Sequence, residues 1–232
     1  MSEPTYVQFL DLACGAFLLA GVLVLWRRDL TAIVRLFAAQ GLALTAIVVV
    51  LGVRQGSTEL IVVGVALAGL RAGLLPYLIL RALPGKNGSE PDAWGVPGGG
   101  EARETRPVVN VATSLVAAAV FALIAYAVSQ PLIRLAPSPA AQAVPVALTV
   151  LLAGFFVLVT RRRALSQVVG FLLIDNAITA TAFLTTNGVP LVVELGVSLD
   201  VLLAVLVLRV LATRMRVAFG GTDLDELREL HD

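Results

Sequence analysis

Residues that build metal and redox sites in proteins are scarce in this chain. Its 232 residues include one cysteine, Cys14, and one histidine, His231. A single cysteine excludes an internal disulfide and any cysteine-ligated cluster. With so few soft ligands, a zinc, nickel or iron–sulfur site built by this protein is not expected. We therefore predict no metal site and no bound cofactor.

Charge is scarce as well. Asp, Glu, Lys and Arg together make up 14% of the residues, and the formal net charge is only +1. This charge gives no indication of nucleic-acid binding. Apolar residues, in contrast, make up 58% of the chain, and the mean hydropathy is +0.92. This composition is typical of integral membrane proteins, so the lipid bilayer is the first partner that we predict.

Seven apolar segments set the predicted architecture. Most are about 20 residues long, which is enough to cross a hydrocarbon core of roughly 30 Å. They run over residues 7–26, 30–51, 60–80, 108–127, 144–160, 165–184 and 191–211. The sequence therefore predicts an all-α, polytopic membrane helix bundle of about seven transmembrane helices.

The basic residues predict the orientation of this bundle. If the N-terminus is outside, only Arg54 and Arg134 lie in the outer loops. Twelve other Lys and Arg residues, among them Arg27, Arg28 and Arg161, then lie in the inner loops and tail. By the positive-inside rule, this asymmetry predicts a cell-membrane protein whose N-terminus is outside the cell and whose C-terminus is in the cytoplasm.

The chain divides into five predicted parts. The stretch between the third and fourth spans is rich in Pro and Gly and is read as a solvated cytoplasmic linker. The last residues read as a short cytoplasmic helix with an apolar leucine stripe, which either docks on a protein partner or is a tail without function. The parts are an N-terminal three-helix unit (1–83), the linker (84–107), a linking helix with an outer loop (108–143), a C-terminal three-helix unit (144–219) and the tail helix (220–232).

The two three-helix units resemble each other. Arg27-Arg28-Asp29-Leu30 opens the second span, and Arg162-Arg163-Ala164-Leu165 opens the sixth. Sliding one onto the other places Gln40 over Asp175 and brings Arg71 near Asp200. Because one linking helix separates the units, both would have the same orientation, which predicts a parallel duplication.

Two acids mark the middle of the last two spans. Asp175 lies about ten residues before the turn at 185–190, and Asp200 about ten after it, so each is about 15 Å deep. A bare carboxylate there costs from about 3 to more than 10 kcal/mol, so it needs a partner, water or a proton. A proton or ion pathway is the favoured interpretation, and a neutral, hydrogen-bonded aspartate that holds the helix pair together is the alternative.

Gln40 and Arg71 are predicted at the same depth. Arg71 keeps its proton, so it needs a carboxylate or a wet cavity, and pairing with one of the two aspartates is the obvious arrangement. Alternatively, Arg71 anchors an acid of a neighbouring subunit or a lipid headgroup. Glu194, near the outer end of the last span, lies either at the mouth of a pathway or in the membrane interface. Pro76 is expected to kink or loosen the third span one turn after Arg71.

Two related resemblances follow from these residues. The segment Gly170-Phe171-Leu172-Leu173-Ile174-Asp175-Asn176, after a double arginine, resembles the Gly-Leu-Glu-x-x-x-Asn segment of NADH–quinone oxidoreductase subunit K, and the C subunit of Mrp-type antiporters is similar. Over its whole length the chain more closely resembles hydrogenase-4 component E. That likeness is carried by Arg-Leu-Phe-Ala-Ala-Gln at 35–40, Ala-Leu-Ser-Gln-Val-Val-Gly-Phe-Leu at 164–172 and Val-Glu-Leu-Gly-Val-Ser-Leu-Asp at 193–200.

The resemblance implies a membrane subunit with no catalytic centre of its own. Its partners would be other membrane subunits of a hydrogenase, complex I-like or Mrp-like complex, and it would lend midplane carboxylates to proton or cation movement. Asp200 falls on an acidic position of the family and is expected to matter more than Asp175. The glutamate that subunit K usually carries on the preceding helix falls on Leu172 in this sequence, and the acid is found three residues later, at Asp175. Two alternatives remain: a stand-alone transporter with the 3+1+3 arrangement of SWEET-type carriers, and a purely structural scaffold subunit.

Overall fold

The computed structural model describes residues 1–27, 29–82, 111–135, 137–161, 164–186, 202 and 204–206. Within these ranges, six helical segments are long and apolar enough to cross a membrane, by length and composition. The predicted all-α membrane fold is confirmed for this part of the chain. The linker 84–107, the tail 220–232 and most of the seventh predicted span, 191–211, lie outside the described residues, although 202 and 204–206 are helical.

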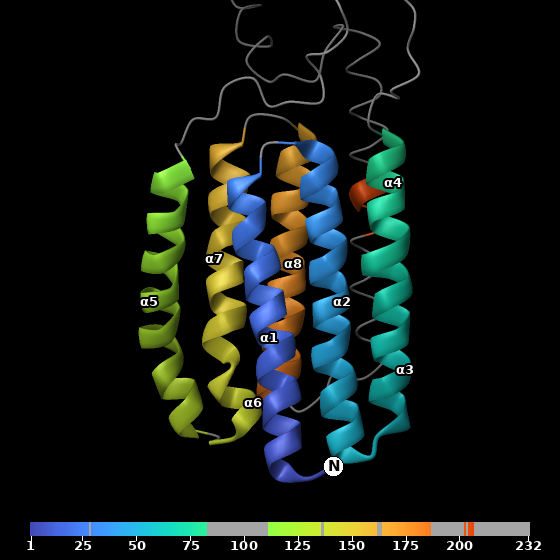
Figure 1. The fold of residues 1–232 in the computed structure, drawn as a ribbon, viewed down its shortest axis with the longest axis vertical. Helices are drawn as coiled ribbons and strands as arrows, with labels where there is room; N and C mark the ends of the chain where they lie inside the picture. The colour runs from blue at the N-terminus through green and yellow to red at the C-terminus, as the bar shows by residue number, and fades with distance from the viewer. Residues whose placement is uncertain are drawn as a thin grey trace, which may run out of the picture.

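The helices follow the apolar segments closely (Figure 1). Their bounds are α1 (Glu3–Trp26), α2 (Leu30–Gln55), α3 (Thr58–Leu67), the π-helix η1 (Ala68–Leu74), α4 (Leu75–Ala82), α5 (Val111–Leu135), α6 (Pro139–Gln142), α7 (Val144–Thr160) and α8 (Ala164–Thr186). α3, η1 and α4 follow each other without a break and form one rod, which is the predicted third span.

The fourth span is longer than predicted. The sequence placed its end at residue 127, but α5 continues to Leu135 through Pro131. In the turn before this proline, the Ser129 hydroxyl and the Gln130 side-chain amide both donate to the Tyr126 carbonyl. Pro131 lacks the N–H that would bond to the Ala127 carbonyl, so these two bonds support the carbonyl next to the one that loses its donor.

Short turns place successive helices antiparallel. The Asp29 carboxylate accepts from the Thr31 N–H at the start of α2, and the Ser57 hydroxyl accepts from the Leu60 N–H at the start of α3. Between α2 and α3, Gly56 adopts φ 67°, a left-handed conformation that suits glycine and ends the helix. The described helices therefore run alternately up and down the bundle (Figure 1).

Four helices form the centre of the described bundle. α1 packs on α2 and α7, and α8 packs on α7 and α2. The α3–η1–α4 rod lies against α2 at one edge, and α5 lies against α7 and α1 at the other (Figure 1). The buried positions of α5 include four small residues, Ser114, Ala118, Ala125 and Ser129. Small residues let membrane helices approach closely, so α5 is held by close packing rather than by large side chains.

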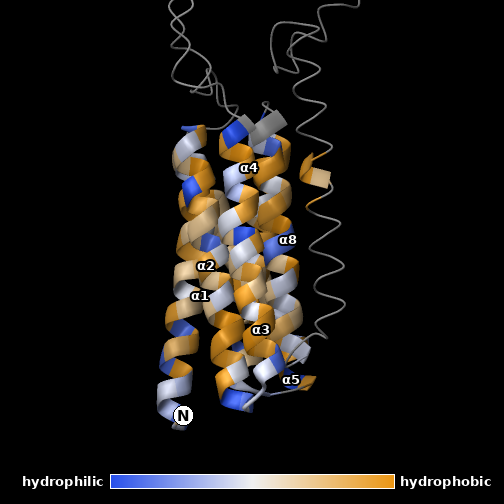
Figure 2. Ribbon diagram, turned by 90° about the vertical axis from the view of Figure 1, so that its right-hand side faces the viewer, coloured by the Kyte–Doolittle hydropathy of each residue, from blue (hydrophilic) through white to orange (hydrophobic). Residues whose placement is uncertain are grey.

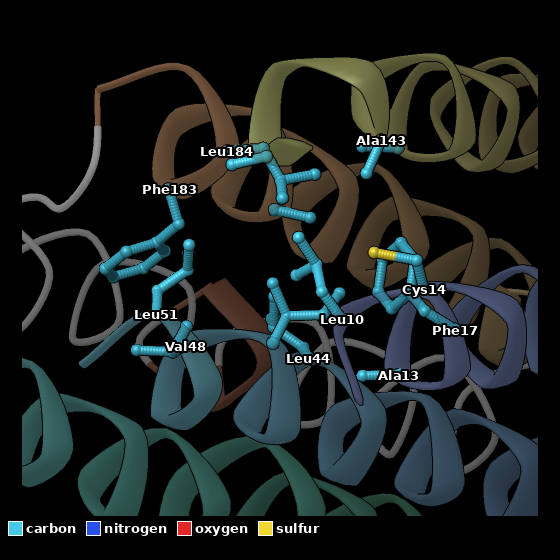
Figure 3. Packing of buried hydrophobic residues seen from close by; sticks show 14 of the residues in the cluster. Leu10, Ala13, Cys14, Phe17, Leu44, Val48, Leu51, Ala143, Phe183 and Leu184 are labelled. Carbon is cyan, nitrogen blue, oxygen red and sulfur yellow. The ribbon is translucent and has the colours of Figure 1, made fainter. Parts of the chain in front are cut away.

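The buried apolar residues form two clusters at different heights. The first, which we call the N-terminal-end cluster, includes Leu10, Phe17, Leu44, Leu51 and Phe183 and is shown in Figure 3. The second, the opposite cluster, includes Val24, Phe37, Leu75, Leu173 and Val205. α1, α2, the α3–η1–α4 rod, α7 and α8 contribute to both clusters, so each crosses the level between them.

Candidate functional site

A layer of polar side chains separates the two apolar clusters. It consists of Gln40 on α2, Arg71 on η1, and Asp175, Asn176 and Thr179 on α8, and we call it the polar layer. All five residues are buried, and Asp175, with 8% of its surface exposed, is the most accessible. On α8 the layer lies between Leu173 of the opposite cluster and Ala180 of the N-terminal-end cluster. Figure 2 shows hydrophilic colour on α8 at about this height.

The polar layer lies about halfway along the helices that are long and apolar enough to cross a membrane. Asp175 is eleven residues from either end of α8, which corresponds to about 16 Å of helix on each side. Gln40 is ten residues from the start of α2, or about 15 Å. The predicted common depth of Gln40, Arg71 and Asp175 is therefore confirmed by their contacts and by their positions along the helices.

Arg71 is the centre of the layer. Its Nη1 lies 2.6 Å from Asp175 Oδ2 and donates to Asn176 Oδ1 at 2.7 Å. Its Nη2 donates to Thr179 Oγ1 at 2.9 Å. The guanidinium thus receives one charged partner and two neutral partners from a single helix. The rod and α8 are joined through this side chain at the level where neither apolar cluster continues.

Gln40 extends the layer to a third element. Asn176 donates through Nδ2 to Gln40 Oε1 at 3.2 Å, so Asn176 bonds to α2 and η1 at once. Among the described residues, the buried Gln40 Nε2 has no hydrogen-bond partner. A Cβ added at Gly21 would lie 3.1 Å from this nitrogen, so α1 also reaches the layer closely.

The spacing of buried residues explains the π-helix that carries Arg71. Along the rod, the buried residues Leu67, Arg71, Leu75 and Ile79 recur every four residues. In an α-helix each such step drifts by about 40°, so three steps would turn Ile79 about 120° away from Leu67. A wider turn corrects this drift. The Leu75 N–H donates to the Leu70 carbonyl, five residues back, as a π-helix requires.

Pro76 stands just after the widened segment. It has no N–H, and its ring crowds the carbonyl of the preceding turn. The prediction that Pro76 loosens this span is consistent with the observed η1, although the departure from α-geometry lies before the proline, around Arg71, and not at it. Gly41 on α2 allows the close approach of this segment, because an added Cβ there would lie 3.1 Å from the Arg71 carbonyl oxygen.

α8 is positioned differently, by a close contact with α7. A Cβ added at Gly154 would lie 2.8 Å from Ile174 Cγ1 and 3.0 Å from the Ile174 backbone nitrogen. A Cβ added at Gly170 would lie 2.9 Å from the Leu158 nitrogen. The two glycines therefore let the α7 and α8 backbones touch directly. Ile174 precedes Asp175, so this contact fixes the height and rotation of the carboxylate.

The expected pairing of Arg71 with one of the two aspartates is observed for Asp175. Leu172, where the resemblance places a glutamate, is instead fully buried in the opposite cluster. Asp200 and Glu194 lie outside the described residues, so their roles stay predictions. The predicted duplication also stays a prediction.

Asn176 and Thr179 were not recognised as site residues from the sequence. They follow Asp175 by one and four positions, and the i, i+4 spacing places Thr179 on the same face of the helix as the acid. Polar residues within one turn of a midplane acid were the available signal. Elsewhere in the described ranges, no group of three or more His, Cys, Asp or Glu side chains is placed to hold a metal ion.

One relative is similar over its whole length. The uncharacterized protein Rv0085 of Mycobacterium tuberculosis (strain ATCC 25618 / H37Rv) is 50% identical over 232 residues, which cover 100% of this chain and 100% of that protein. No family model matches the chain. No solved structure matches it either. The likeness to the mycobacterial protein extends over every helix and every connecting segment.

Proposed function

The chain belongs to the family of the mycobacterial protein Rv0085, and we propose that it is a non-catalytic integral membrane subunit of a hydrogenase-4-like or complex I-like assembly. In this proposal, redox centres belong to other subunits, and this chain contributes midplane charged groups to proton or cation movement. The observation that carries the proposal is the Arg71–Asp175 ion pair, which is buried halfway along membrane-spanning helices. The sequence resemblance to hydrogenase-4 component E supplies the kind of assembly.

The energetic argument concerns why a charged pair is found at this depth. A charged side chain at a bilayer centre costs from about 3 to more than 10 kcal/mol, so such residues mark ion or proton pathways by default. Holding helices together does not require charge, because neutral bonds such as the one between Asn176 and Gln40 serve that purpose in the same layer. The pair therefore supports a role in moving charge.

Asp175 is the member of the pair that exchanges a proton. A guanidinium stays protonated in proteins, whereas a carboxylate accepts and releases a proton. The Asp175 side chain is 11% exposed and that of Arg71 only 1%, so the carboxylate is the accessible side of the pair. While Arg71 is engaged, its positive charge favours the ionised form of the carboxylate. If Arg71 withdraws, a lone carboxylate at this depth is costly and takes up a proton.

Opening and closing of the pair would thus load and release one proton. A change of charge or conformation in a neighbouring subunit biases this equilibrium if it favours one of the two arrangements. Asp200 and Glu194, which the resemblance and the sequence place in the last span, are proposed as further groups of the same pathway. Gln40 is proposed to hold Asn176 in register with Arg71.

A stand-alone transporter is the second candidate. The polar layer joins Gln40 and Arg71 of the predicted N-terminal unit to α8 of the predicted C-terminal unit. Transporters built from repeated units bind their substrates near the midplane, where the units meet. This arrangement favours a transporter only if the chain works without partner subunits, so the two candidates differ in assembly.

The first experiment is purification of the tagged chain from its native membrane in a mild detergent. We expect hydrogenase-like or complex I-like subunits to co-migrate with it. Deletion of residues 222–232, the predicted docking tail, should lower their recovery while membrane insertion persists. A chain that purifies alone and catalyses solute or ion flux in vesicles would support the transporter and contradict the subunit proposal.

The second experiment compares Asp175→Asn with Asp200→Asn in the assembled complex. Both changes keep the side-chain shape and remove an exchangeable carboxyl proton. The resemblance predicts that Asp200 is the more important of the two for ion movement. In our proposal the ion pair with Arg71 makes Asp175 necessary for ion movement as well. We expect each variant to lower proton or sodium uptake into vesicles during turnover at normal subunit content. Normal uptake by an assembled Asp175→Asn complex would reduce the ion pair to a structural contact.

Orientation in the cell membrane is part of the proposal. Cysteines introduced at Gly98 and Gly188 should react with a membrane-impermeant reagent from the inside and the outside, respectively. This result would place the N-terminus outside and the C-terminus inside. Labelling of both positions from one side would contradict the seven-span arrangement.

A further inference from the structure

The rod that carries Arg71 is fixed at two levels and widened between them. Leu67 and Leu75 are buried on either side of Arg71, with 2% and 1% of their surfaces exposed. Between them, η1 is a seven-residue π-helix with Arg71 as its central residue. π-helical turns are rare, occur mostly as single-turn bulges inside α-helices and are found often at functional sites. The departure of the rod from α-geometry therefore coincides with its buried charge.

One face of η1 has few neighbours among the described residues. Among the described residues, a Cβ added at Gly69 meets no neighbour within 4 Å, and one added at Gly73 meets only the Ala68 carbonyl oxygen, at 3.8 Å. The α2 side of η1 is packed closely, since a Cβ added at Gly41 would lie 3.1 Å from the Arg71 carbonyl carbon and oxygen. Glycine also allows backbone conformations that other residues avoid. The face with Gly69 and Gly73, and not the face toward α2, is therefore the one on which η1 can change conformation without meeting a described side chain.

A shift of the widened turn would move Arg71 while its flanks stay in place. In the widened turn, a backbone N–H bonds to the carbonyl five residues back. When such an N–H bonds instead to the carbonyl four residues back, the widened turn moves along the rod by one residue, and that residue changes its place relative to the turn. It then rotates by about 100° and moves about 1.5 Å along the axis. Leu67 and Leu75 need not move, because the extra residue remains between them. Arg71 would turn away from α8, which carries Asp175, Asn176 and Thr179.

We propose that η1 is the moving element that engages and releases Arg71 from Asp175, and so regulates the ion pair on which the proposed function rests. Pro76 limits the shift on one side, because a proline cannot donate the hydrogen bond that a migrating turn requires. The widened turn moves toward Gly69, the opposite side. α8 stays in place during this motion, since Gly154 and Gly170 bring it into backbone contact with α7.

The test uses hydrogen–deuterium exchange of the full chain in lipid nanodiscs. In the wild type, we expect the amides of Ala68–Leu74 to exchange faster than those in the middle of α2. The double variant Gly69→Ala/Gly73→Ala should slow this exchange by about fivefold for each glycine replaced, because alanine favours the hydrogen-bonded helix over its open form. Gly15→Ala is the matched control: Gly15 is exposed, and an added Cβ there also meets no described neighbour within 4 Å, but it lies in a regular α-helix.

The same variants are then measured for ion uptake in the assembled complex. Slower exchange of η1 together with slower uptake, and normal behaviour of Gly15→Ala, would support the proposal. If η1 exchanges no faster than α2, or if uptake is unchanged when its exchange is slowed, the proposal is overturned. If η1 exchanges fast and is slowed by the alanines but the wild type moves no ions, the moving segment stands and the proposed function fails.

Discussion

The two elements that carry the ion pair, α8 and η1, are built in different ways. α8 is a regular helix in backbone contact with α7 at Gly154 and Gly170. η1 is a π-helix that touches the α2 backbone at Gly41, but on its other face a Cβ added at Gly69 meets no described neighbour within 4 Å, and a proline follows soon after it. One element therefore fixes the position of Asp175, and the other leaves Arg71 able to move. An ion pair built in this way can open on one side only.

The apolar clusters explain why the rod tolerates a π-helix at Arg71. Leu67 and Leu75 anchor the rod in the N-terminal-end cluster and the opposite cluster, respectively, whereas no residue of η1 belongs to either cluster. Each fully buried leucine contributes roughly 1.5–3 kcal/mol on an area basis, although helices in lipid gain less from apolar contact than helices in water. The packing of the rod is thus concentrated on both sides of the charge, and the charged segment between them is free to depart from α-geometry.

The largest effect on stability is expected from removing Arg71. Arg71→Leu leaves the Asp175 carboxylate buried without its positive partner, and loss of one member of a buried pair costs about 3–5 kcal/mol. We expect a matching fall in the free energy of unfolding, measured by denaturant titration in mixed micelles. Adding Asp175→Leu should recover most of the loss, because no unpaired charge remains. A double variant as unstable as the single one would show that the loss comes from packing and not from charge.

Filling the contact between α7 and α8 should have the next largest effect. Gly154→Ala places a methyl group 2.8 Å from Ile174 Cγ1 and 3.0 Å from its backbone nitrogen, and overpacking of this kind costs about 1–3 kcal/mol. Gly69→Ala, within η1 at a position where the added Cβ meets no described neighbour within 4 Å, should be neutral or stabilising. Thermal unfolding of both variants sharpens the contrast between the two elements. Equal destabilisation would mean that η1 is packed as tightly as α8.

Much of this fold follows from the positions of the apolar runs. The predicted span 30–51 corresponds to α2, Leu30–Gln55, and the predicted span 60–80 corresponds to the α3–η1–α4 rod. Counting residues from the ends of these runs also placed Arg71 at one depth with Asp175 and Asp200, which led to the expectation that it pairs with one of them but did not select Asp175. Depth along a helix is a one-dimensional property, so the sequence determines it directly.

The parts that could not be predicted depend on contacts between helices. The π-helix arises because Leu67 and Leu75 are both held by other helices, and no local pattern reveals that both must be buried. Arg161 gives a second example, since it was interpreted only as an inner-loop charge. In the structure it is 8% exposed, and its Nη2 donates to the carbonyls of Leu25 and Arg27 at the end of α1. Partners 130 or more residues away in the chain leave no local signal.

The smallest effect is expected from removing one neutral partner of Arg71. Thr179→Val keeps the shape of the side chain and deletes the acceptor of Arg71 Nη2, while Asp175 and Asn176 continue to hold Nη1. Hydrogen bonds between membrane helices contribute about 1 kcal/mol or less, so we expect a loss of that size in the free energy of unfolding. Thr181→Val is the control on the same helix, because its hydroxyl bonds only to the Ala177 carbonyl of α8 itself. Since Thr179 bridges the fixed element and the movable one, its loss should also speed hydrogen exchange in η1, whereas Thr181→Val should not. If both valines behave alike in exchange, Thr179 does not restrain Arg71, and the fixed side of the pair consists of Asp175 and Asn176 alone.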